Sequence, residues 1–431
     1  MSKIPYDAVL FDLDGTLTRS EEGIMNCARF ALAKMGWEIP KEQTLRAFIG
    51  PPLYGSFRDL CGMDDTQCAQ AVALYRERYT ETGMFENAVY PGIRMLLQKL
   101  QRSGVFLAVA TGKPQVPTER ILDHFGLRKF FRAVAGISEN DQEADKKHLI
   151  LRALPKRYDK AVMVGDRRFD VEGAKGVGIA SIGVTYGYGG REELESAGAD
   201  HIVASVSDLM ALLCPDMPSP KGFFLSVEGL DGSGKTTQVD LLEKHLHQWG
   251  FEVKRTREPG GCPISEKIRH VVLDINNLGM SPTCEALLYA ASRAQHVREV
   301  IRPSVEKGMV VLCDRFVDSS IAYQGGGRQL GVPHVAAINA PAVDGLMPDC
   351  TVYLDIDHME ALRRRGKASA LDRIEVEAES FHFRVAQAYR QLILENADRY
   401  VTVDGTLAPE EIGIQAFAAV LRRLLALEEA E

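Results

Sequence analysis

The chain has 431 residues, more than the about 250–300 at which a single hydrophobic core stops growing, so at least two domains are expected. Its 45% hydrophobic and 26% charged residues are typical of a globular protein, and a net charge of -8 gives no global attraction for nucleic acid or anionic membranes. No stretch approaches the about 20 apolar residues of a membrane span, and the first residues carry no apolar signal region, so we expect a cytoplasmic protein without nucleic-acid or membrane partners.

The first predicted strand covers the apolar residues 8–11 and leads directly into Asp12 and Asp14. At the carboxyl edge of an open α/β sheet, two such carboxylates can divide the work of phosphoryl transfer, because one attacks phosphorus while the other moves a proton. Their like charges need a cation, which predicts Mg2+. Taken alone, the pair has a simpler alternative, a turn.

Three later segments favour the phosphoryl-transfer interpretation over the turn. They supply a hydroxyl and N–H donors for phosphate, a lysine, and two further carboxylates. In chain order these are Thr111 and Gly112 after a predicted strand at 105–110, Lys146 at the start of a predicted helix, and Asp166 and Asp170 after a predicted strand at 161–164.

These four motifs, in this order, resemble the haloacid dehalogenase superfamily of aspartyl-phosphate phosphatases over about residues 5–213. The resemblance implies a Rossmannoid core at 1–214 with a helical cap at about 19–90. Its substrate would be an unidentified phosphomonoester, with nucleotides among the candidates. The implied roles are Asp12 as nucleophile, Asp14 as general acid/base, Thr111, Gly112 and Lys146 (or the adjacent Lys147) as phosphate binders, and Asp12, Asp14, Asp166 and Asp170 as Mg2+ ligands.

The middle of the chain predicts a nucleotide site. The apolar residues 223–227 form a predicted strand that runs into a glycine-rich loop ending in Lys235 and Thr236. This spacing matches the P-loop, in which N–H groups hold phosphates, the lysine reaches the β and γ phosphates, and the hydroxyl binds Mg2+. A plain glycine-rich turn is the alternative. The P-loop is favoured because it needs a strand before the loop and a helix after it, and the sequence predicts both. We expect ATP on Gly229, Leu230, Asp231, Gly232, Ser233, Gly234, Lys235, Thr236 and Thr237.

Later residues suit a phosphorylated acceptor. Arg257 follows a predicted strand at 251–256 and can hold a phosphate through two hydrogen bonds. Tyr289 and Arg293 lie four residues apart on a predicted helix at 285–305, where they can stack on and hydrogen-bond a base. An ordinary amphipathic helix is the alternative explanation for this pair.

Two more groups fit phosphoryl transfer. A predicted strand at 309–313 ends at Asp314 and Arg315, which again places a carboxylate and an arginine at the carboxyl end of a strand. The cations within 363–367 would suit a lid that closes over the transferred phosphate, although a solvated helix face is the usual alternative.

From residue 222 onward these motifs, with a Tyr-Gln-Gly-Gly-Gly-Arg run at 323–328, resemble the bacterial thymidylate kinase family. The resemblance implies a P-loop nucleoside monophosphate kinase fold, ATP and dTMP as substrates, and a homodimer through this domain. It implies that Lys235 and Asp314 act in the transfer, with Asp314 organising the metal that Thr236 helps to bind. The implied dTMP ligands are Asp231, Arg257, Tyr289, Arg293, Arg315 and Gln324.

Two features depart from that family's pattern. Tyr289 stands where Phe is common, so its hydroxyl needs a partner. In one enterobacterial form the lid arginines alternate, whereas two matching positions here are Gly366 and Ala368. Because Gly232 occupies the P-loop position where eukaryotic forms carry an arginine, the transferring cation must come from the lid, as Arg364, Arg365 or Lys367.

Together the motifs predict an α/β protein with two doubly wound parallel-sheet domains, at 1–214 and 222–431, joined by a proline-rich linker at 215–221. We expect Mg2+-dependent phosphomonoester hydrolysis by the first domain and ATP-dependent phosphorylation of dTMP by the second. The alternative for the first domain is a non-catalytic nucleotide-binding or regulatory module. A phosphatase that freely hydrolysed dTMP would consume the kinase's own substrate, so we expect a different preferred ester.

Overall fold

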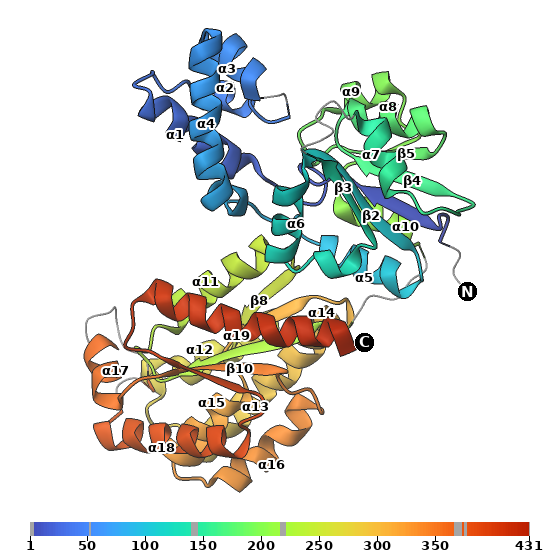
Figure 1. Cartoon of the computed structure of the whole chain (residues 1–431). Coiled ribbons are helices and arrows are strands. Elements are labelled where there is room, and N and C mark those ends of the chain that lie inside the picture. Colours follow the sequence, from blue (N-terminus) through green and yellow to red (C-terminus); the bar gives the residue numbers. More distant parts are fainter. Residues whose placement is uncertain are drawn as a thin grey trace. The chain divides into compact units, whose positions relative to one another are not determined.

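The computed structural model of the chain describes residues 4–50, 53–138, 145–215, 221–365, 373–374 and 377–430 (Figure 1). They belong to two compact units, Met1–Pro218 with His247–Phe251, and Ser219–Leu246 with Glu252–Glu431. Residues 216–220 of the predicted linker lie outside the described residues. No helix in the described part of the chain is long and apolar enough to cross a bilayer.

The first unit is built on a parallel sheet, which has 6 strands in the described residues, in the order β3-β2-β1-β4-β5-β6. Its strands are β1 (Ala8–Phe11), β2 (Phe106–Pro114), β3 (Ala133–Ile137), β4 (Ala161–Gly165), β5 (Ala180–Val184) and β6 (His201–Val203). Alternate residues of β1 pack into two hydrophobic cores: Val9 and Phe11 lie in the core on one face of the sheet, and Ala8 and Leu10 lie in the core on the other face. A sheet covered on both faces leaves its carboxyl edge as the place for a site.

Helices cover both faces of this sheet. They are α5 (Ile93–Arg102), α6 (Gln115–His124), α7 (Lys146–Ala153), α8 (Arg168–Val177), α9 (Arg191–Ala197) and α10 (Val206–Leu213), with a 3-10 turn at Arg128–Phe130.

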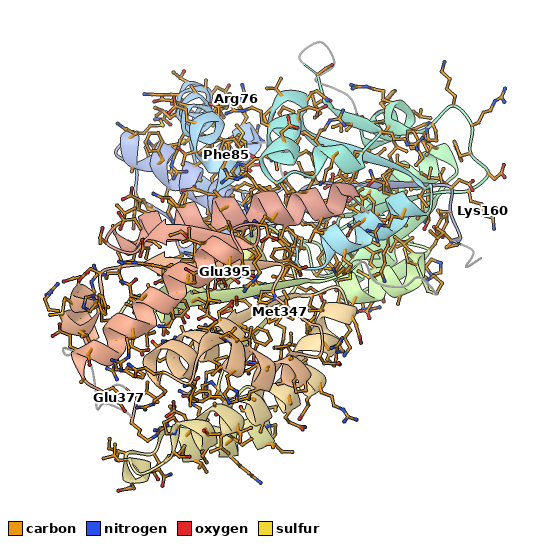
Figure 2. The ribbon with its side chains drawn as sticks, turned by 90° about the horizontal axis from the view of Figure 1, so that it is seen from below. Arg76, Phe85, Lys160, Met347, Glu377 and Glu395 are labelled. Carbon is orange, nitrogen blue, oxygen red and sulfur yellow. The ribbon has the colours of Figure 1, made fainter. Side chains whose placement is uncertain are left out.

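A helical cap separates β1 from β2 in the chain and has a core of its own (Figure 1). It consists of α1 (Glu21–Lys34), α2 (Glu42–Arg46), α3 (Leu53–Cys61), α4 (Asp65–Glu81) and a 3-10 turn at Gly83–Phe85, whose Phe85 is labelled in Figure 2. A capping box begins α4, since the Asp64 carboxylate accepts from Gln67 N while Gln67 Oε1 accepts from Asp64 N.

The second unit also has a parallel sheet, with 5 strands among the described residues in the order β11-β10-β7-β9-β8. They are β7 (Phe223–Gly229), β8 (Val253–Arg257), β9 (Val310–Asp314), β10 (Cys350–Asp355) and β11 (Tyr400–Asp404). Because β7 pairs with β9 through Val227 and Asp314, the predicted P-loop begins beside Asp314. The two parallel-sheet α/β domains confirm the predicted fold class.

The helices of this unit carry several of its candidate residues. They are α11 (Lys235–Gln248), α12 (Pro263–Leu273), α13 (Pro282–His296), α14 (Arg302–Glu306), α15 (Val317–Ser320), α16 (Val332–Val343), α17 (His358–Arg365), α18 (Glu379–Glu395) and α19 (Pro409–Ala430), with a 3-10 turn at Ile275–Asn277 and π-helical turns at Val297–Ile301 and Ile321–Gly327. The helix predicted at 285–305 is therefore interrupted by a π-turn, and Pro303 lies just beyond it.

Candidate active sites

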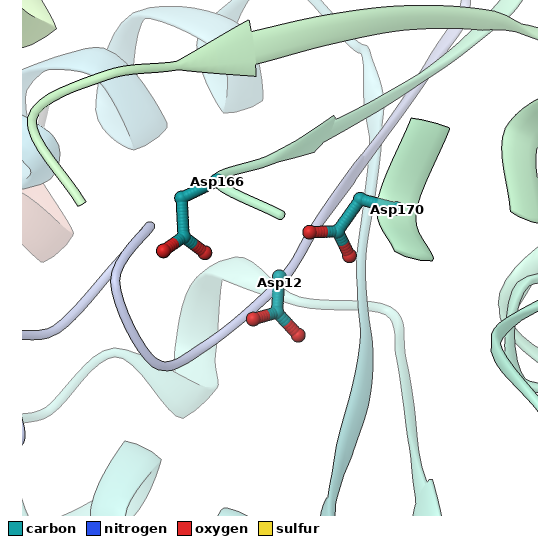
Figure 3. Close-up of side chains that lie close together, drawn as sticks. All are labelled: Asp12, Asp166 and Asp170. Carbon is teal, nitrogen blue, oxygen red and sulfur yellow. The ribbon is translucent and has the colours of Figure 1, made fainter. Parts of the chain in front are cut away.

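Three aspartates meet at the carboxyl edge of the N-terminal sheet (Figure 3). Asp12 follows β1, Asp166 follows β4, and Asp170 lies in the first turn of α8. Parallel pairing of Phe11 with Val164 makes β1 and β4 end at the same level. One carboxylate oxygen of each aspartate lies within 4.8 Å of the other two, and all three residues are buried. The structure thus brings together three of the four carboxylates predicted to bind metal.

Lys146 places a positive charge between two of these carboxylates. Its Nζ lies 2.6 Å from Asp12 Oδ1 and 2.5 Å from Asp170 Oδ1. Burial raises the pKa of Asp12 to about 6, with Asp170 adding to the rise although Lys146 opposes it. Burial, Asp170 and Asp12 together raise the pKa of Asp166 to about 8. The single positive charge of Lys146 therefore does not neutralise the negative charges of the three carboxylates.

This group of oxygens fits Mg2+, which prefers hard carboxylate ligands. Asp166 is held firmly, because its Oδ2 accepts from Tyr188 N at 2.7 Å and its Oδ1 accepts from the Thr16 hydroxyl at 3.4 Å. Gly15 has a φ of +80°, and a Cβ there would lie 2.2 Å from Asp166 Oδ2. Only glycine allows the loop after β1 to approach this carboxylate so closely.

Asp14 lies outside the three-aspartate group. This position differs from the prediction, which placed Asp14 among the metal ligands. Its Oδ2 lies 2.7 Å from Lys113 Nζ, and the same Nζ donates to the Tyr79 hydroxyl of cap helix α4 at 2.6 Å. Burial opposes the charge on Lys113, but Asp14 and Tyr79 raise the pKa of Lys113. The sequence analysis did not include Lys113, although it directly follows Gly112 in the motif.

Thr111 and Gly112 lie inside β2, which extends to Pro114 instead of ending at residue 110. The pairing of β2 with β3 shifts register beyond Ala110, so the strand continues irregularly where a loop was expected. Since β2 also pairs in parallel with β1, Thr111 lies at the sheet edge that carries Asp12.

The predicted P-loop joins β7 to α11 in the second unit. Lys235 Nζ donates to the carbonyl oxygens of Gly229 at 3.2 Å and Leu230 at 2.8 Å, so the lysine folds back over its own loop. Burial and the neighbouring Arg315 lower the pKa of Lys235 to about 8. The nearest carboxylate oxygen, Asp231 Oδ1, lies 3.8 Å from Nζ, so a phosphate that takes the place of the carbonyls would add a negative charge in direct contact with the ammonium group.

Oxygens suited to a second Mg2+ lie around this loop. Within the described residues, Asp314 Oδ1 and Ser233 Oγ are buried without a hydrogen-bond partner. Thr236 and Thr237 are exposed in the first turn of α11. Carboxylate and hydroxyl oxygens are the ligands that Mg2+ uses beside phosphates, so these residues fit the ion.

Arg315 connects the P-loop to the wall of a cavity. Its Nη1 donates to Gly229 O at 3.1 Å, and its Nη2 pairs with the Asp231 carboxylate. The Tyr323 hydroxyl, which the sequence analysis did not single out, donates to Asp231 Oδ2 at 2.8 Å. Burial opposes ionisation of Asp231, but Arg315 and then Lys235 lower its pKa.

The cavity has a volume of about 170 Å³. Five of the six predicted dTMP ligands line it: Asp231, Tyr289, Arg293, Arg315 and Gln324. The sixth, Arg257, is absent from the described lining, because its Nη2 lies 2.9 Å from Glu266 Oε2 and its side chain is about half exposed. The stacking role of Tyr289 stays a prediction.

Arg293 is engaged by the protein itself. Its Nε donates to Glu258 Oε2 at 2.8 Å, and its Nη2 lies 2.7 Å from the same oxygen while donating to Phe316 O. Its Nη1 donates to Ser320 Oγ and Asn339 Oδ1. Since all five N–H groups already meet acceptors, the predicted hydrogen bond to a base would have to share one of them.

The predicted lid arginines begin at the end of α17. Arg364 Nε donates to Glu360 Oε1 at 2.8 Å, and its Nη1 donates to Gly405 O at 2.9 Å. This arrangement directs Arg364 along its own helix and toward the loop after β11. Lys367, the third predicted lid cation, lies outside the described residues.

The helix that carries the lid arginines packs directly on the P-loop. Gly232 has a φ of +87°, and a Cβ there would lie 2.2 Å from Ala361 O and 3.1 Å from Arg365 N. The close approach explains why this position holds no side chain, and it places the backbone of Arg365 next to the loop. Of the two described candidates, Arg365 is therefore the one whose backbone borders the phosphate site.

Comparison with known proteins divides the chain in the same way. Residues 227–415 match the family model "Thymidylate kinase", and residues 9–184 match the model "Haloacid dehalogenase-like hydrolase". A thymidylate kinase of Pelobacter propionicus is 47% identical over 210 residues, which cover 47% of this chain and 96% of that protein. The chain belongs to the thymidylate kinase family. Both predicted family resemblances are thereby confirmed, and the chain is an enzyme with a kinase domain and a hydrolase domain.

Another thymidylate kinase, from Thermoanaerobacter sp. strain X514, is 50% identical over 185 residues, covering 43% of this chain and 90% of that protein. Among solved structures, a predicted phosphatase from Clostridium acetobutylicum is 43% identical, with a TM-score of 0.44, and the match covers 48% of this chain and 96% of that chain.

Proposed function

We propose that the C-terminal domain, residues 222–431, transfers the γ-phosphoryl group of ATP to dTMP and forms dTDP. The strongest support is the cavity beside the P-loop, because one guanidinium, that of Arg315, contacts both Gly229 of the loop and Asp231 in the cavity wall. An acceptor phosphate in this cavity would meet a cation that already touches the donor loop.

On the donor side, the loop N–H groups and Lys235 bind the ATP phosphates, and Lys235 gives up its two carbonyl partners to do so. Mg2+, held by Thr236 and Asp314, supplies charge neutralisation of the β and γ phosphates. Gly232 leaves the loop without its own arginine, so Arg365 or Arg364 stabilises the charge that develops during transfer.

On the acceptor side, Arg315 holds the dTMP phosphate, and Arg257 joins it after leaving Glu266. Asp231 accepts a hydrogen bond from the 3′-hydroxyl, and Tyr289 stacks on the base. The two substrates are thus held with phosphorus close to the attacking oxygen, which is most of what phosphoryl transfer needs.

The kinase assignment is tested by measuring ADP formation from ATP with each of the common nucleoside monophosphates. We expect dTMP to be the preferred acceptor and Lys235→Met to remove the activity while leaving the fold intact. A clear preference for a purine monophosphate would contradict the proposal.

We further propose that the N-terminal domain, residues 1–214, hydrolyses a phosphomonoester. The support is the buried group of Asp12, Asp166 and Asp170 with Lys146 beside it. Asp12 attacks phosphorus and forms an aspartyl phosphate while Asp14 gives a proton to the leaving alcohol. Asp14 then takes a proton from the water that breaks the acyl-phosphate bond.

The remaining residues of this site hold the phosphate. Lys146, Thr111 and Gly112 bind its oxygens, and Mg2+ on Asp12, Asp166 and Asp170 supplies charge neutralisation between the carboxylates and the phosphate. Through Lys113, Asp14 is also tied to Tyr79, so the position of the cap bears on the proton-transferring group.

A screen of phosphomonoesters with Asp12→Asn as control tests this proposal. We expect hydrolysis that depends on Mg2+ and on Asp12, with a preferred substrate other than dTMP. Rapid dTMP hydrolysis by the wild-type chain would contradict the substrate prediction, and no hydrolysis of any ester would favour a non-catalytic module.

We also propose a homodimer formed through the kinase domain. The support is a set of exposed apolar side chains on and between α12 and α13: Ile264, Val271, Ile275, Leu278 and Leu287 are 43–62% exposed. Light scattering after gel filtration should give twice the monomer mass, and Leu278→Glu with Leu287→Glu should halve it. A wild-type monomer at micromolar concentration would contradict the proposal.

A further inference from the structure

Gln324 stands out among the residues that line the cavity. Its side chain is 2% exposed, and its Nε2 donates to Glu285 Oε1 at 2.8 Å. Its Oε1 is buried without a hydrogen-bond partner. Among the described lining residues, it is the one that holds such an unpartnered buried side-chain atom. A buried acceptor of this kind is costly unless a ligand pairs with it.

Glu285 determines which way the Gln324 amide points. It is fully buried on α13, and two arginines donate to it: Arg373 Nη2 donates to Oε2 at 2.6 Å, and Arg328 Nε donates to Oε2 at 3.2 Å and to Oε1 at 3.3 Å. A carboxylate surrounded by guanidinium groups only accepts hydrogen bonds. The amide NH2 of Gln324 must therefore face Glu285, and the amide oxygen must face away from it.

The cavity consequently offers an acceptor beside a donor. Arg293 presents only N–H groups and a positive charge, and a carbonyl oxygen of a base would share one N–H with the protein acceptor that it already meets. Gln324 presents an acceptor, which suits a ring N–H. Thymine and uracil carry this pattern at O4 and N3. Cytosine carries the reverse pattern, an amino group at C4 and an unprotonated N3, so it is mismatched at both positions.

We propose that Glu285 is a positioning residue that turns the acceptor oxygen of Gln324 into the cavity and so selects pyrimidine monophosphates with an N3–H over dCMP. This inference rests on the proposed dTMP kinase activity. Through Arg373 the same carboxylate also contacts the segment that follows the predicted lid.

The test compares kcat/KM for dTMP and dCMP in the wild-type enzyme and in Glu285→Gln. In the variant, the arginines donate hydrogen bonds to the amide oxygen of the substituted side chain. Its NH2 group then faces Gln324, so the Gln324 amide must turn over to present its oxygen to that NH2. The cavity then presents NH2 where it presented oxygen. We expect the dTMP/dCMP ratio to fall by about tenfold or more.

Glu377→Gln is the matched control. Glu377, labelled in Figure 2, also pairs with Arg328, but its recorded contacts do not include Gln324. This variant removes a charge from the same network, so it should change stability without changing the dTMP/dCMP ratio by more than about twofold. A similar fall in the ratio for both variants would overturn the positioning role.

If Glu285→Gln does not fold, the wild-type enzyme still tests whether the cavity reads N3–H and O4, with 3-deaza-dTMP, in which a ring C–H replaces N3–H and O4 becomes a hydroxyl. We expect kcat/KM for this analogue to be about tenfold or more below that for dTMP, and equal values would overturn the inference. A wild-type enzyme inactive on dTMP would overturn the proposed function as well. An active one whose folded Glu285→Gln variant keeps the wild-type ratio overturns the inference alone.

Discussion

Arg315 is held in a left-handed backbone conformation, with a φ of +69°, which costs a non-glycine residue about 1 kcal/mol or more. The conformation is stabilised by what the side chain reaches, Gly229 O on one side and the Asp231 carboxylate on the other. Strain of this kind persists where the surrounding structure imposes it, and here the surroundings are the two halves of the proposed transfer site.

Replacing Arg315 with Ala should lower kcat/KM for dTMP by roughly 100-fold, because a charge-assisted hydrogen bond to phosphate is worth about 2–3 kcal/mol. ATP affinity should change far less, since Arg315 contacts the P-loop at the Gly229 carbonyl and the Asp231 carboxylate and not at the N–H groups that would hold the ATP phosphates. Steady-state kinetics with each substrate varied in turn measures both effects. Equal losses for ATP and dTMP would contradict an acceptor-side role.

Some of these residues could be predicted from the sequence and others could not. Asp12, Asp166 and Asp170 each follow or closely follow a buried strand, so parallel pairing brings them to one edge. The partner of Asp14 and the saturation of Arg293 depend on side chains from distant segments. Spacing along the chain contains no information about such competition for hydrogen bonds.

At the scale of elements, α17 and the P-loop constrain each other through Gly232. Gly232 and Gly234 both have φ near +90°, but a Cβ on Gly234 would meet nothing within 4 Å, whereas a Cβ on Gly232 would meet Ala361 O at 2.2 Å. Alanine at either position bears the cost of positive φ, and only the Gly232 variant must also displace α17.

We therefore expect Gly232→Ala to lower the free energy of unfolding by about 1–3 kcal/mol more than Gly234→Ala does. Thermal unfolding without nucleotide measures the difference, which separates the packing cost from the backbone cost. Equal destabilisation of the two variants would show that α17 yields to the added methyl group.

An ion pair in the cap joins Arg78 of α4 to Glu86, the residue that follows the 3-10 turn. Arg78 Nη1 and Nη2 each lie 2.7 Å from an oxygen of Glu86, and both side chains are largely buried. The hydrogen bonds from Arg78 lower the pKa of Glu86 although burial opposes them. The pair spans the 3-10 turn at Gly83–Phe85, with which the cap ends.

Because its folded pKa is below its unfolded value of about 4.3, Glu86 stabilises the fold above that pH and loses this contribution as pH falls through the folded pKa. Glu86→Gln should therefore lower stability by about 1 kcal/mol at pH 7 and by progressively less below pH 4. Glu42→Gln, which breaks the exposed pair with Arg46, should have little effect at either pH. A constant difference across this range would exclude the ion pair as its cause.

Elements with strong apolar patterns could be predicted well, whereas irregular ones could not. The strands at 8–11 and 161–164 were expected nearly where β1 and β4 lie. The extension of β2 to Pro114 and the π-turn at Val297–Ile301 result from pairing with β3 and from a local change of hydrogen-bond register. Neither changes the hydrophobic periodicity on which the predictions depend.

At the scale of the whole molecule, two parallel-sheet units carry opposite phosphate chemistries on one chain. In each unit the candidate residues gather at the carboxyl ends of strands, at Asp12 and Asp166 in the first and at Gly229 and Asp314 in the second. The contacts that build each group come from its own unit. We therefore expect the two activities to be separable by single substitutions.

The most direct test measures both activities in the same preparations of wild-type enzyme, Asp12→Asn and Lys235→Met. dTDP formation from ATP and dTMP reports the kinase, and phosphate release from the best ester of the screen reports the hydrolase. We predict that Asp12→Asn loses ester hydrolysis and keeps dTDP formation, while Lys235→Met does the reverse. Loss of both activities in either folded variant, or hydrolysis that survives Asp12→Asn, would contradict two independent active sites.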